Sequence, residues 1–459
     1  MRTLLINPPW VRRQGNIWQD VASVMPPLGL AWLAAQLERA DHPVAILDAH
    51  AERQDWETLP ARLQGFGPLD VVGITATTSL IGNALALARL VRALFPKALV
   101  VLGGVHPTVL PEEVLAEPSV DLVVRGEGEL TLLDIVSGAD WRMIPGVSFR
   151  DGAGFVHNPD RELVPDLDSL AQPAYHLLPM SRYYPAAGAY RRLPAISMLA
   201  TRGCPGRCTF CYRLFGKRIR TRSGRRLAEE ARMLQDRFGI REICFYDDTF
   251  TVVRKEVEAF LDGLRDLKVD LTWSCFSRVD AVDEDILRRM KQAGCHQIMY
   301  GVESASPEIL RNIGKRITLE KVEDAIRMTK RVGIDVRAAF MIGNPGETRQ
   351  SLEDTMNFAI RLNPDLVIFN IATPFPGTEM FQWAEEHGLL TTKDWEDYDL
   401  SRPVMTLPTL AQADLERFYS RAYRRFYLRP GYILQRLGKI RSLSDMAQAL
   451  RGVRAVLNV

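Results

Sequence analysis

Along the first 138 residues, short apolar runs alternate with longer stretches of helical periodicity. The runs are bounded by turn residues and are almost uniformly apolar, which predicts parallel strands buried on both faces. We expect strands at Thr3–Asn7, Val44–Asp48, Val71–Thr75, Leu99–Gly103 and Leu122–Arg125, with helices around Pro27–Ala40, Trp56–Leu63, Ile81–Phe95 and Pro111–Glu117. Five strands with helices between them predict an α/β fold, a doubly wound Rossmann-like sheet with right-handed connections.

Ligands of doubly wound sheets bind beyond the carboxyl ends of the strands. In this chain the expected strand ends carry small, polar or glycine-rich segments, which let a ligand approach the backbone closely. The candidate ligand-contacting residues at these ends are Asn7, Thr75, Thr77, Ser79, Gly103, Gly104, His106, Gly126 and Glu127.

Three further regions complete the chain. Residues 139–190 predict a connector, in which Val147–Val156 forms a hairpin around a glycine-containing turn. Residues 191–382 predict six strands, at Ala195–Thr201, Glu242–Tyr246, Leu271–Phe276, Gln297–Val302, Asp335–Ile342 and Leu366–Ile371, each followed by a helical stretch except the last. Such a series predicts a partial (β/α)6 TIM-type barrel, with functional residues at the carboxyl ends of its strands. Residues 383–459 predict a basic helical region.

Charge and hydropathy exclude several classes of function. The chain of 459 residues has 58 Lys and Arg against 56 Asp and Glu, so no overall nucleic-acid-binding charge is present. No stretch approaches the roughly 18 apolar residues of a membrane-spanning helix. The N-terminus also lacks the apolar core of a signal peptide. We therefore expect a cytoplasmic protein that binds no nucleic acid.

The six cysteines are unevenly placed. Cys204, Cys208 and Cys211 lie within eight residues, directly after the first expected barrel strand. The other three lie in apolar runs and predict buried structural residues: Cys244, Cys275 and Cys295. A tight cluster of thiols predicts a metal or iron–sulfur site rather than a disulfide framework. Three thiolates hold three irons of a cubane and leave the fourth open to a ligand. The alternatives are free thiols or a structural zinc site, which would normally need a fourth Cys or His nearby.

The spacing CxxxCxxC, with Phe210 before the last cysteine, resembles that of the radical S-adenosylmethionine (radical SAM) enzymes. The resemblance implies that Cys204, Cys208 and Cys211 hold a 4Fe-4S cluster whose open iron is chelated by S-adenosylmethionine. In that family, one electron from the cluster cleaves the sulfonium and releases a 5′-deoxyadenosyl radical. A reductant such as flavodoxin or ferredoxin is therefore implied.

The same resemblance places S-adenosylmethionine-binding residues at the cysteine loop and at the ends of the later barrel strands. These residues are Phe210, Tyr246, Asp247, Asp248, Ser274, Glu303 and Gly343. Asp247 and Asp248 stand where many family members have Gly-Gly-Glu, and a helix N-cap is the alternative for them. For Glu303 the alternative is a surface cap, and for Gly343 a plain strand–helix turn.

A doubly wound domain before such a barrel resembles the cobalamin-binding subgroup, which includes radical methyltransferases and anaerobic Mg-protoporphyrin monomethyl ester cyclases. The resemblance covers nearly the whole chain and implies that the nine strand-end residues of the first domain bind cobalamin. The Asp-x-His-x-x-Gly motif that ligates cobalt in cobalamin mutases is missing after the first strand. Asp48-Ala49-His50 imitates part of it after the second strand, but Arg53 stands in place of the glycine. We therefore expect neither His50 nor His106 to ligate cobalt, and expect a structural or hydrogen-bonding role for His106.

The function implied is hydrogen abstraction from an unreactive carbon followed by methyl transfer from methylcobalamin to that carbon. Three alternatives stay open: a radical oxidative cyclase or rearrangement enzyme, a sheet domain without cofactor, and a non-catalytic cobalamin or redox sensor. Relatives act on tetrapyrroles, lipids, antibiotics and peptides, so we expect a small-molecule, lipid-like or tetrapyrrole-like substrate.

Two surface features add further alternatives. The basic tail, which includes Lys439 and Arg441, predicts a solvated helix face or a peripheral contact with a membrane surface or an anionic substrate. The aromatic residues Trp18, Tyr183 and Tyr184 line a pocket or belong to the core.

Overall fold

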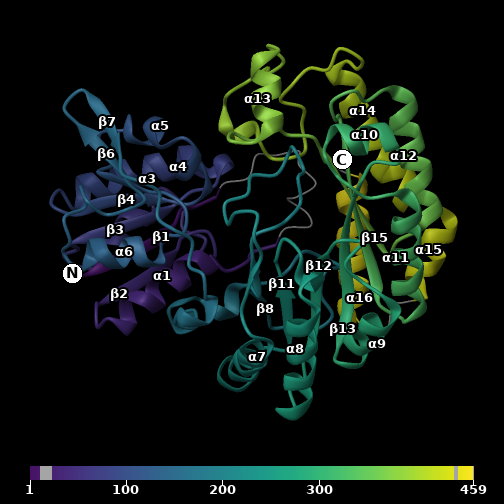
Figure 1. The fold of residues 1–459 in the computed structure, drawn as a ribbon, viewed down its shortest axis with the longest axis horizontal. Coiled ribbons are helices and arrows are strands. Elements are labelled where there is room, and N and C mark those ends of the chain that lie inside the picture. The colour runs from purple at the N-terminus through teal and green to yellow at the C-terminus, as the bar shows by residue number, and fades with distance from the viewer. Residues whose placement is uncertain (11–22, 439–442, 458–459) are drawn as a thin grey trace.

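The computed structural model describes residues 1–10, 23–438 and 443–457. Trp18, Lys439 and Arg441, to which the sequence analysis assigns possible roles, lie outside the described residues. Figure 1 shows an N-terminal domain, in purple and blue, beside a barrel in teal and green, with the C-terminal helices in yellow along the barrel. In the part of the chain that the structure describes, no helix is long and apolar enough to cross a membrane.

The N-terminal domain contains a seven-stranded sheet of order β2-β1-β3-β4-β5-β6-β7. Its parallel strands are β1 (Thr3–Asn7), β2 (Val44–Asp48), β3 (Val71–Thr75), β4 (Leu99–Gly103) and β5 (Leu122–Val124). The strand order reverses at β1 and β3, which is where ligands bind in such sheets. The predicted doubly wound fold is confirmed.

The hairpin expected in the connector extends this sheet instead of standing apart from it. Its strands β6 (Val147–Asp151) and β7 (Gly154–His157) continue the sheet antiparallel to β5. The sheet is therefore two strands wider than the five predicted.

Helices cover both faces of the N-terminal sheet, which explains why its strands are apolar at almost every position. Leu5 packs with α1 (Leu28–Arg39) and α6 (Glu129–Val136), whereas Leu4 packs on the opposite face with α2 (Leu59–Gln64) and α3 (Ile81–Leu94). Two further short helices come after β4, namely α4 (Val105–Val109) and α5 (Pro111–Leu115). His106 lies on α4 and is buried.

The second domain is an open barrel of six parallel strands, ordered β15-β14-β13-β12-β11-β8. The strands are β8 (Ala195–Met198), β11 (Glu242–Phe245), β12 (Thr272–Ser277), β13 (Cys295–Glu303), β14 (Asp335–Ile342) and β15 (Leu366–Ile371). The helices between them include α7 (Gly224–Phe238), α8 (Arg254–Asp266), α9 (Glu284–Gln292), α11 (Leu319–Arg331) and α12 (Arg349–Leu362). The predicted partial barrel is confirmed.

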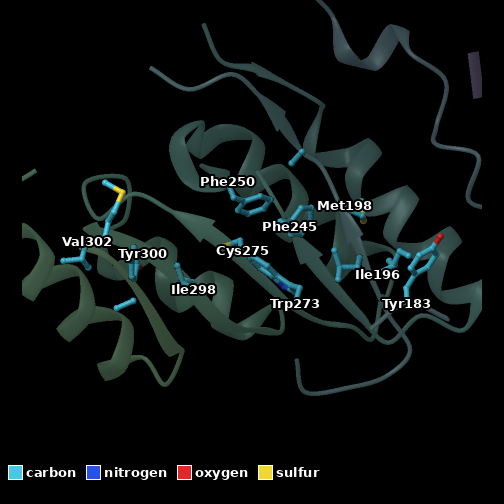
Figure 2. Packing of buried hydrophobic residues seen from close by; sticks show 14 of the residues in the cluster. Tyr183, Ile196, Met198, Phe245, Phe250, Trp273, Cys275, Ile298, Tyr300 and Val302 are labelled. Atoms are coloured by element: carbon cyan, nitrogen blue, oxygen red, sulfur yellow. The ribbon is translucent and has the colours of Figure 1, made fainter. Parts of the chain in front are cut away.

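Aromatic side chains fill the layer between the barrel sheet and its outer helices. Figure 2 shows Phe245, Phe250 and Trp273 packed together near Cys275. The Phe245 and Phe250 ring centroids are 4.5 Å apart, and the Phe245 and Trp273 centroids are 5.9 Å apart. Cys244, Cys275 and Cys295 are all buried, as predicted for structural cysteines.

The C-terminal region is helical, as predicted, with α14 (Gln412–Tyr427), α15 (Pro430–Leu437) and α16 (Leu443–Leu457). Helix α14 lies against β15, the last strand of the barrel sheet. The Tyr427 hydroxyl donates to the Val367 carbonyl at 2.6 Å and accepts from the Val367 amide at 2.9 Å. Tyr423 makes the same pair of bonds to Phe369, at 2.9 and 3.1 Å. Two tyrosine hydroxyls thus occupy backbone groups of the edge strand.

Candidate active site

The three clustered cysteines lie on one loop between β9 (Thr201–Arg202) and β10 (Arg220–Thr221), which pair antiparallel. The first barrel strand ends earlier than expected, at Met198, and the β9–β10 pair closes the base of the loop. A Cβ atom at Gly206 would lie 3.3 Å from the Cys204 sulfur and 3.9 Å from the Cys208 sulfur.

The thiols of Cys208 and Cys211 share a hydrogen bond. In the described part of the chain, no group of three His, Cys, Asp or Glu side chains is arranged to hold a metal ion as it stands. The donor set nevertheless fits an iron–sulfur cluster, because one loop carries three soft sulfur ligands and two of them, those of Cys204 and Cys208, lie beside the side-chain-free position Gly206. Phe210 is partly buried and packs against the main core.

Positive charge beside this loop favours the thiolate form that binds metal. The hydrogen bond from Cys211, together with the positive charges of Lys315 and Arg278, lowers the pKa of Cys208 to about 7, although burial opposes the shift. Burial raises the pKa of Cys204, while Arg278 opposes that rise.

Glu303 forms an ion pair with Lys315 at 2.8 Å, and both side chains are largely buried. The surface cap considered for Glu303 is therefore wrong. Burial alone would lower the pKa of Lys315, but the carboxylate of Glu303 raises it and keeps the ammonium charged. Glu303 thereby holds a cation beside the cysteine loop.

Asp247 and Asp248 come directly after β11 but have separate environments. Asp247 is fully buried, and its Oδ1 accepts hydrogen bonds from the Ala200 amide at 2.9 Å, the Thr201 hydroxyl at 2.8 Å and the Thr201 amide. Burial raises the pKa of Asp247 to about 7. Asp248 is exposed, and its charge acts on the thiol of Cys204.

Neither aspartate caps a helix, because α8 begins after Val253. The N-cap alternative is thus wrong. Asp247 ties the end of β8 to the end of β11, and Asp248 remains available at the barrel mouth.

Tyr246 and Ser274 lie around a small pocket inside the barrel, together with Cys244, Met299 and Arg337. The Tyr246 ring is 38% exposed and meets the Phe276 ring edge-on, with centroids 5.1 Å apart. The barrel interior therefore combines an aromatic pair with one cationic side chain.

Gly343 begins a turn that Glu347 closes. The buried Glu347 carboxylate accepts from the Gly343 amide at 2.7 Å and from the Asn344 amide at 3.0 Å. Gly343 has φ +83°, and a Cβ there would lie 2.6 Å from Leu415 of α14. Burial raises the pKa of Glu347 to about 7. Sequence reasoning selected the glycine but missed the carboxylate that orders the turn.

A second cavity, of about 210 Å³, lies between the two domains. Five of the nine strand-end candidates line it: Thr75, Gly103, Gly104, Gly126 and Glu127. The barrel domain contributes Leu199, Arg202, Leu214 and Phe215 to the same cavity. Its mostly apolar wall and its glycine-lined edge let a ligand approach the backbone, and its volume has room for part of a large organic ligand such as cobalamin.

The other four candidates do not line this cavity. The Asn7 side chain donates to Asp48 at 2.9 Å, and Thr77 and Ser79 flank the start of the 3-10 helix η2 (Thr78–Leu80). His106 is fully buried, 3.6 Å from Glu113 and edge-on to Trp395. The structural or hydrogen-bonding role expected for His106 stays a prediction, since neither of its ring nitrogens has a hydrogen-bond partner among the described residues.

Glu127 belongs to a buried ion-pair network that joins the two domains. Its carboxylate pairs with Arg202 and Arg220, each at 2.9 Å, and accepts from the Val164 amide at 2.7 Å. Glu129 pairs with Arg202 at 2.5 Å. Burial alone would raise the pKa of Glu127, but the two arginines hold that pKa below its usual range. Sequence reasoning missed this network, although the two arginines flank the cysteine loop.

Comparison with known proteins agrees with this geometry. The profile of the Radical SAM superfamily matches residues 198–359, and that of the B12 binding domain matches residues 17–136. An uncharacterised methyltransferase of Pyrococcus horikoshii is 38% identical over 442 residues, covering 95% of this chain and 94% of that protein. The anaerobic magnesium-protoporphyrin IX monomethyl ester cyclase of Cereibacter sphaeroides is 29% identical and covers 89% of this chain and 68% of that protein.

Among solved structures, a similar fold is found in TsrM of Kitasatospora setae, a radical S-adenosylmethionine methyltransferase with cobalamin and a [4Fe-4S] cluster bound. The TM-score is 0.73 at 19% identity, covering 99% of each chain. At that identity the similarity concerns the fold alone.

The chain is a radical SAM enzyme. It belongs to the family in which a cobalamin-binding domain precedes the radical SAM barrel, and its cofactors are a 4Fe-4S cluster, S-adenosylmethionine and cobalamin. The alternatives of a non-catalytic sensor and of a sheet domain without cofactor are therefore wrong.

Proposed function

We propose that this enzyme transfers a methyl group from cobalamin to a carbon atom of a small organic substrate. The observation that carries the proposal is the shared wall of the interdomain cavity. Gly104 and Gly126 of the sheet domain face a space that Leu199, Leu214 and Phe215 of the barrel also line. Leu199 lies shortly before the three cysteines, and the other two shortly after them. A ligand at the sheet edge would therefore lie next to the cluster loop.

When bound, the cluster with S-adenosylmethionine supplies the radical and cobalamin supplies the methyl group, and the protein supplies position and shielding. We assign the thiols of Cys204, Cys208 and Cys211 to the cluster. We assign Phe210, Tyr246, Asp248, Ser274, Glu303 and Gly343 to the S-adenosylmethionine site. Asp247 acts indirectly in this assignment, because its carboxylate fixes the backbone at Ala200 and Thr201.

The domains divide the work accordingly. Residues 1–138 with the hairpin strands β6 and β7 bind cobalamin, residues 191–382 hold the cluster, and helix α14 covers the edge of the barrel at β15. The aromatic pair of Tyr246 and Phe276 at the barrel mouth suits an apolar or aromatic substrate, such as a tetrapyrrole-like or lipid-like molecule. We place the enzyme in the cytoplasm with a flavodoxin or ferredoxin as reductant; the six free cysteines support a reducing compartment.

A radical cyclisation without methylation is the second candidate. The similarity to the Cereibacter sphaeroides cyclase favours it, whereas the more similar Pyrococcus horikoshii protein carries the name of a methyltransferase.

The test uses anaerobic protein whose cluster has been reconstituted and to which cobalamin has been supplied. It is incubated with S-adenosylmethionine carrying a trideuterated methyl group, reduced methyl viologen and a small-molecule cell extract. We expect bound corrinoid near one per chain, 5′-deoxyadenosine, and a metabolite that gains the labelled methyl group. A metabolite that is consumed without gaining label would favour the cyclase, and protein that binds no corrinoid would overturn the proposal. Cys208→Ala is the control, because it should produce neither product.

A further inference from the structure

A hollow of about 900 Å³ opens beside the cysteine loop. Its walls are the cysteine loop, the connection between α10 (Pro307–Asn312) and α11, and the start of α13 (Glu379–Glu386). Its cationic residues are Arg207, Arg213, Lys217, Arg311, Lys315 and Arg316, and its acidic residues are Glu320 and Glu379. We call this surface the basic groove.

Most of the positive charge of the basic groove is not neutralised. Arg213 pairs with Glu379, and Lys315 pairs with Glu303. The other four cationic side chains are exposed, and none of them forms an ion pair with an acidic residue of the described chain: Arg207, Lys217, Arg311 and Arg316. Clustered unpaired cations on one face attract an anionic partner and raise its rate of association.

The groove directly adjoins the cluster loop. The Thr209 amide donates to the Ile313 carbonyl at 3.0 Å. A Cβ at Gly314 would lie 2.3 Å from the Arg207 carbonyl oxygen and 3.7 Å from the Cys208 Cα, so only glycine permits this approach. A partner seated in the groove would be separated from Cys208 by little more than the backbone of Gly314.

We propose that the basic groove is the docking surface for an acidic one-electron carrier protein that reduces the cluster. The proposal rests on the cluster of the proposed function, which needs one electron from outside the chain. In this step one electron leaves the carrier, which is oxidised by one electron, and the cluster is reduced by one. No proton or group moves.

The shape of the groove favours a protein partner over a small anion. Its unpaired cations are exposed side chains spread over the cysteine loop, helix α10 and the loop that follows α10. Redox partners form small, transient interfaces in which complementary charge sets the rate of encounter. Wide, solvent-exposed positive charge beside the electron acceptor fits that kind of contact.

The experiment uses the reconstituted full chain and a purified acidic flavodoxin in its fully reduced form. The variant is Arg311→Glu/Arg316→Glu, which leaves the cysteines and the Glu303–Lys315 pair intact. Complex formation with the flavodoxin is measured by an anaerobic binding assay, and flavin oxidation is followed by stopped-flow absorbance. We expect the wild-type protein to bind more weakly as salt rises, and the variant to lose about tenfold or more in association rate at low salt.

Two controls isolate the cause. Lys97→Glu/Arg237→Glu makes the same change of charge at exposed positions on other elements and should bind flavodoxin as the wild type does. Reduced methyl viologen, a small cationic donor, should reduce the cluster of the groove variant at least as fast as that of the wild type. Unchanged flavodoxin binding and rate in the groove variant would overturn the proposal. If the wild-type protein binds flavodoxin in a salt-dependent way but transfers no methyl group, the proposed function alone would be overturned.

Discussion

The N-terminal sheet and the barrel both present candidate cofactor-binding residues at the carboxyl ends of parallel strands. The two edges differ in the kinds of residue that form them. At the N-terminal sheet the edge depends on missing side chains, and a Cβ at Gly104 would lie 2.6 Å from the Ala76 carbonyl. At the barrel the edge depends on side chains that are present: the thiols and the Glu303–Lys315 pair. One edge makes room for a large ligand, and the other supplies charge and sulfur to a reactive one.

The largest expected effect comes from removing one thiol from the barrel edge. Cys208→Ala should abolish the cluster and 5′-deoxyadenosine formation, because two thiolates leave the cubane short of ligands. The N-terminal sheet, one face of which packs on a core of its own, should still bind cobalamin. Iron content, cluster absorbance and corrinoid content measure the three effects. Cys244→Ala, at a buried cysteine away from the loop, should keep its cluster; a cluster retained in Cys208→Ala would contradict the assignment.

The opposite change adds a side chain at the edge of the N-terminal sheet. Gly104→Val should reduce bound corrinoid strongly while the cluster is kept, because φ is +107° and the Cβ would press on Ala76. Such backbone strain costs about 1–3 kcal/mol, which corresponds to a change of about fivefold to 150-fold in an equilibrium constant. Gly138→Val is the matched control, since Gly138 also has positive φ but open space around its Cβ. Equal corrinoid content in the two variants would argue against the cavity.

A third change tests how the N-terminal domain and the barrel domain are held together. Glu127→Ala leaves Arg202 and Arg220 buried without their shared carboxylate, a loss of about 3–5 kcal/mol for a buried pair. The urea midpoint of the cofactor-free protein should fall accordingly. Glu229→Ala breaks an exposed pair with Arg225 and should cost only about 0.3–0.5 kcal/mol. Similar midpoints for the two variants would show that the domains hold together without the network.

The last expected effect concerns pH. The pKa of Asp247 is raised to about 7, above its ordinary value of 3.8, so the neutral carboxyl stabilises the fold at low pH. That contribution is complete below about pH 4 and is lost as pH rises towards about 7. Asp247→Asn cannot ionise, so its melting temperature should fall less than that of the wild type across this range. Parallel melting curves for both proteins would contradict the raised pKa.

The sequence predicted the strands well because their hydrophobic pattern is unambiguous. The bounds of β1, β2, β3 and β4 match the predicted runs, since both faces of that sheet are covered and almost every position is apolar. The cysteine loop was also placed directly after the first barrel strand, because its chemistry needs one residue type at a fixed spacing.

Other parts of the site have no local signal in the sequence. Glu127 lies 75 residues from Arg202 and 93 from Arg220, so only the packed domains reveal their network. His106 was placed at a ligand-facing edge, but the short helix α4 turns it towards Trp395. The sequence pattern predicts where a strand ends, whereas the direction of the side chains beyond that end depends on whether the next residues form a helix or a loop.

The tyrosines of α14 have a consequence for the solubility of the whole molecule. A barrel of six strands does not close, and an uncovered edge strand is a template on which another chain can add by strand pairing. Tyr423 and Tyr427 occupy both the amide and the carbonyl of Phe369 and Val367, so backbone groups that an incoming strand would need are already bonded. Helix α14 therefore hinders strand addition at β15 without adding the strands that would close the barrel.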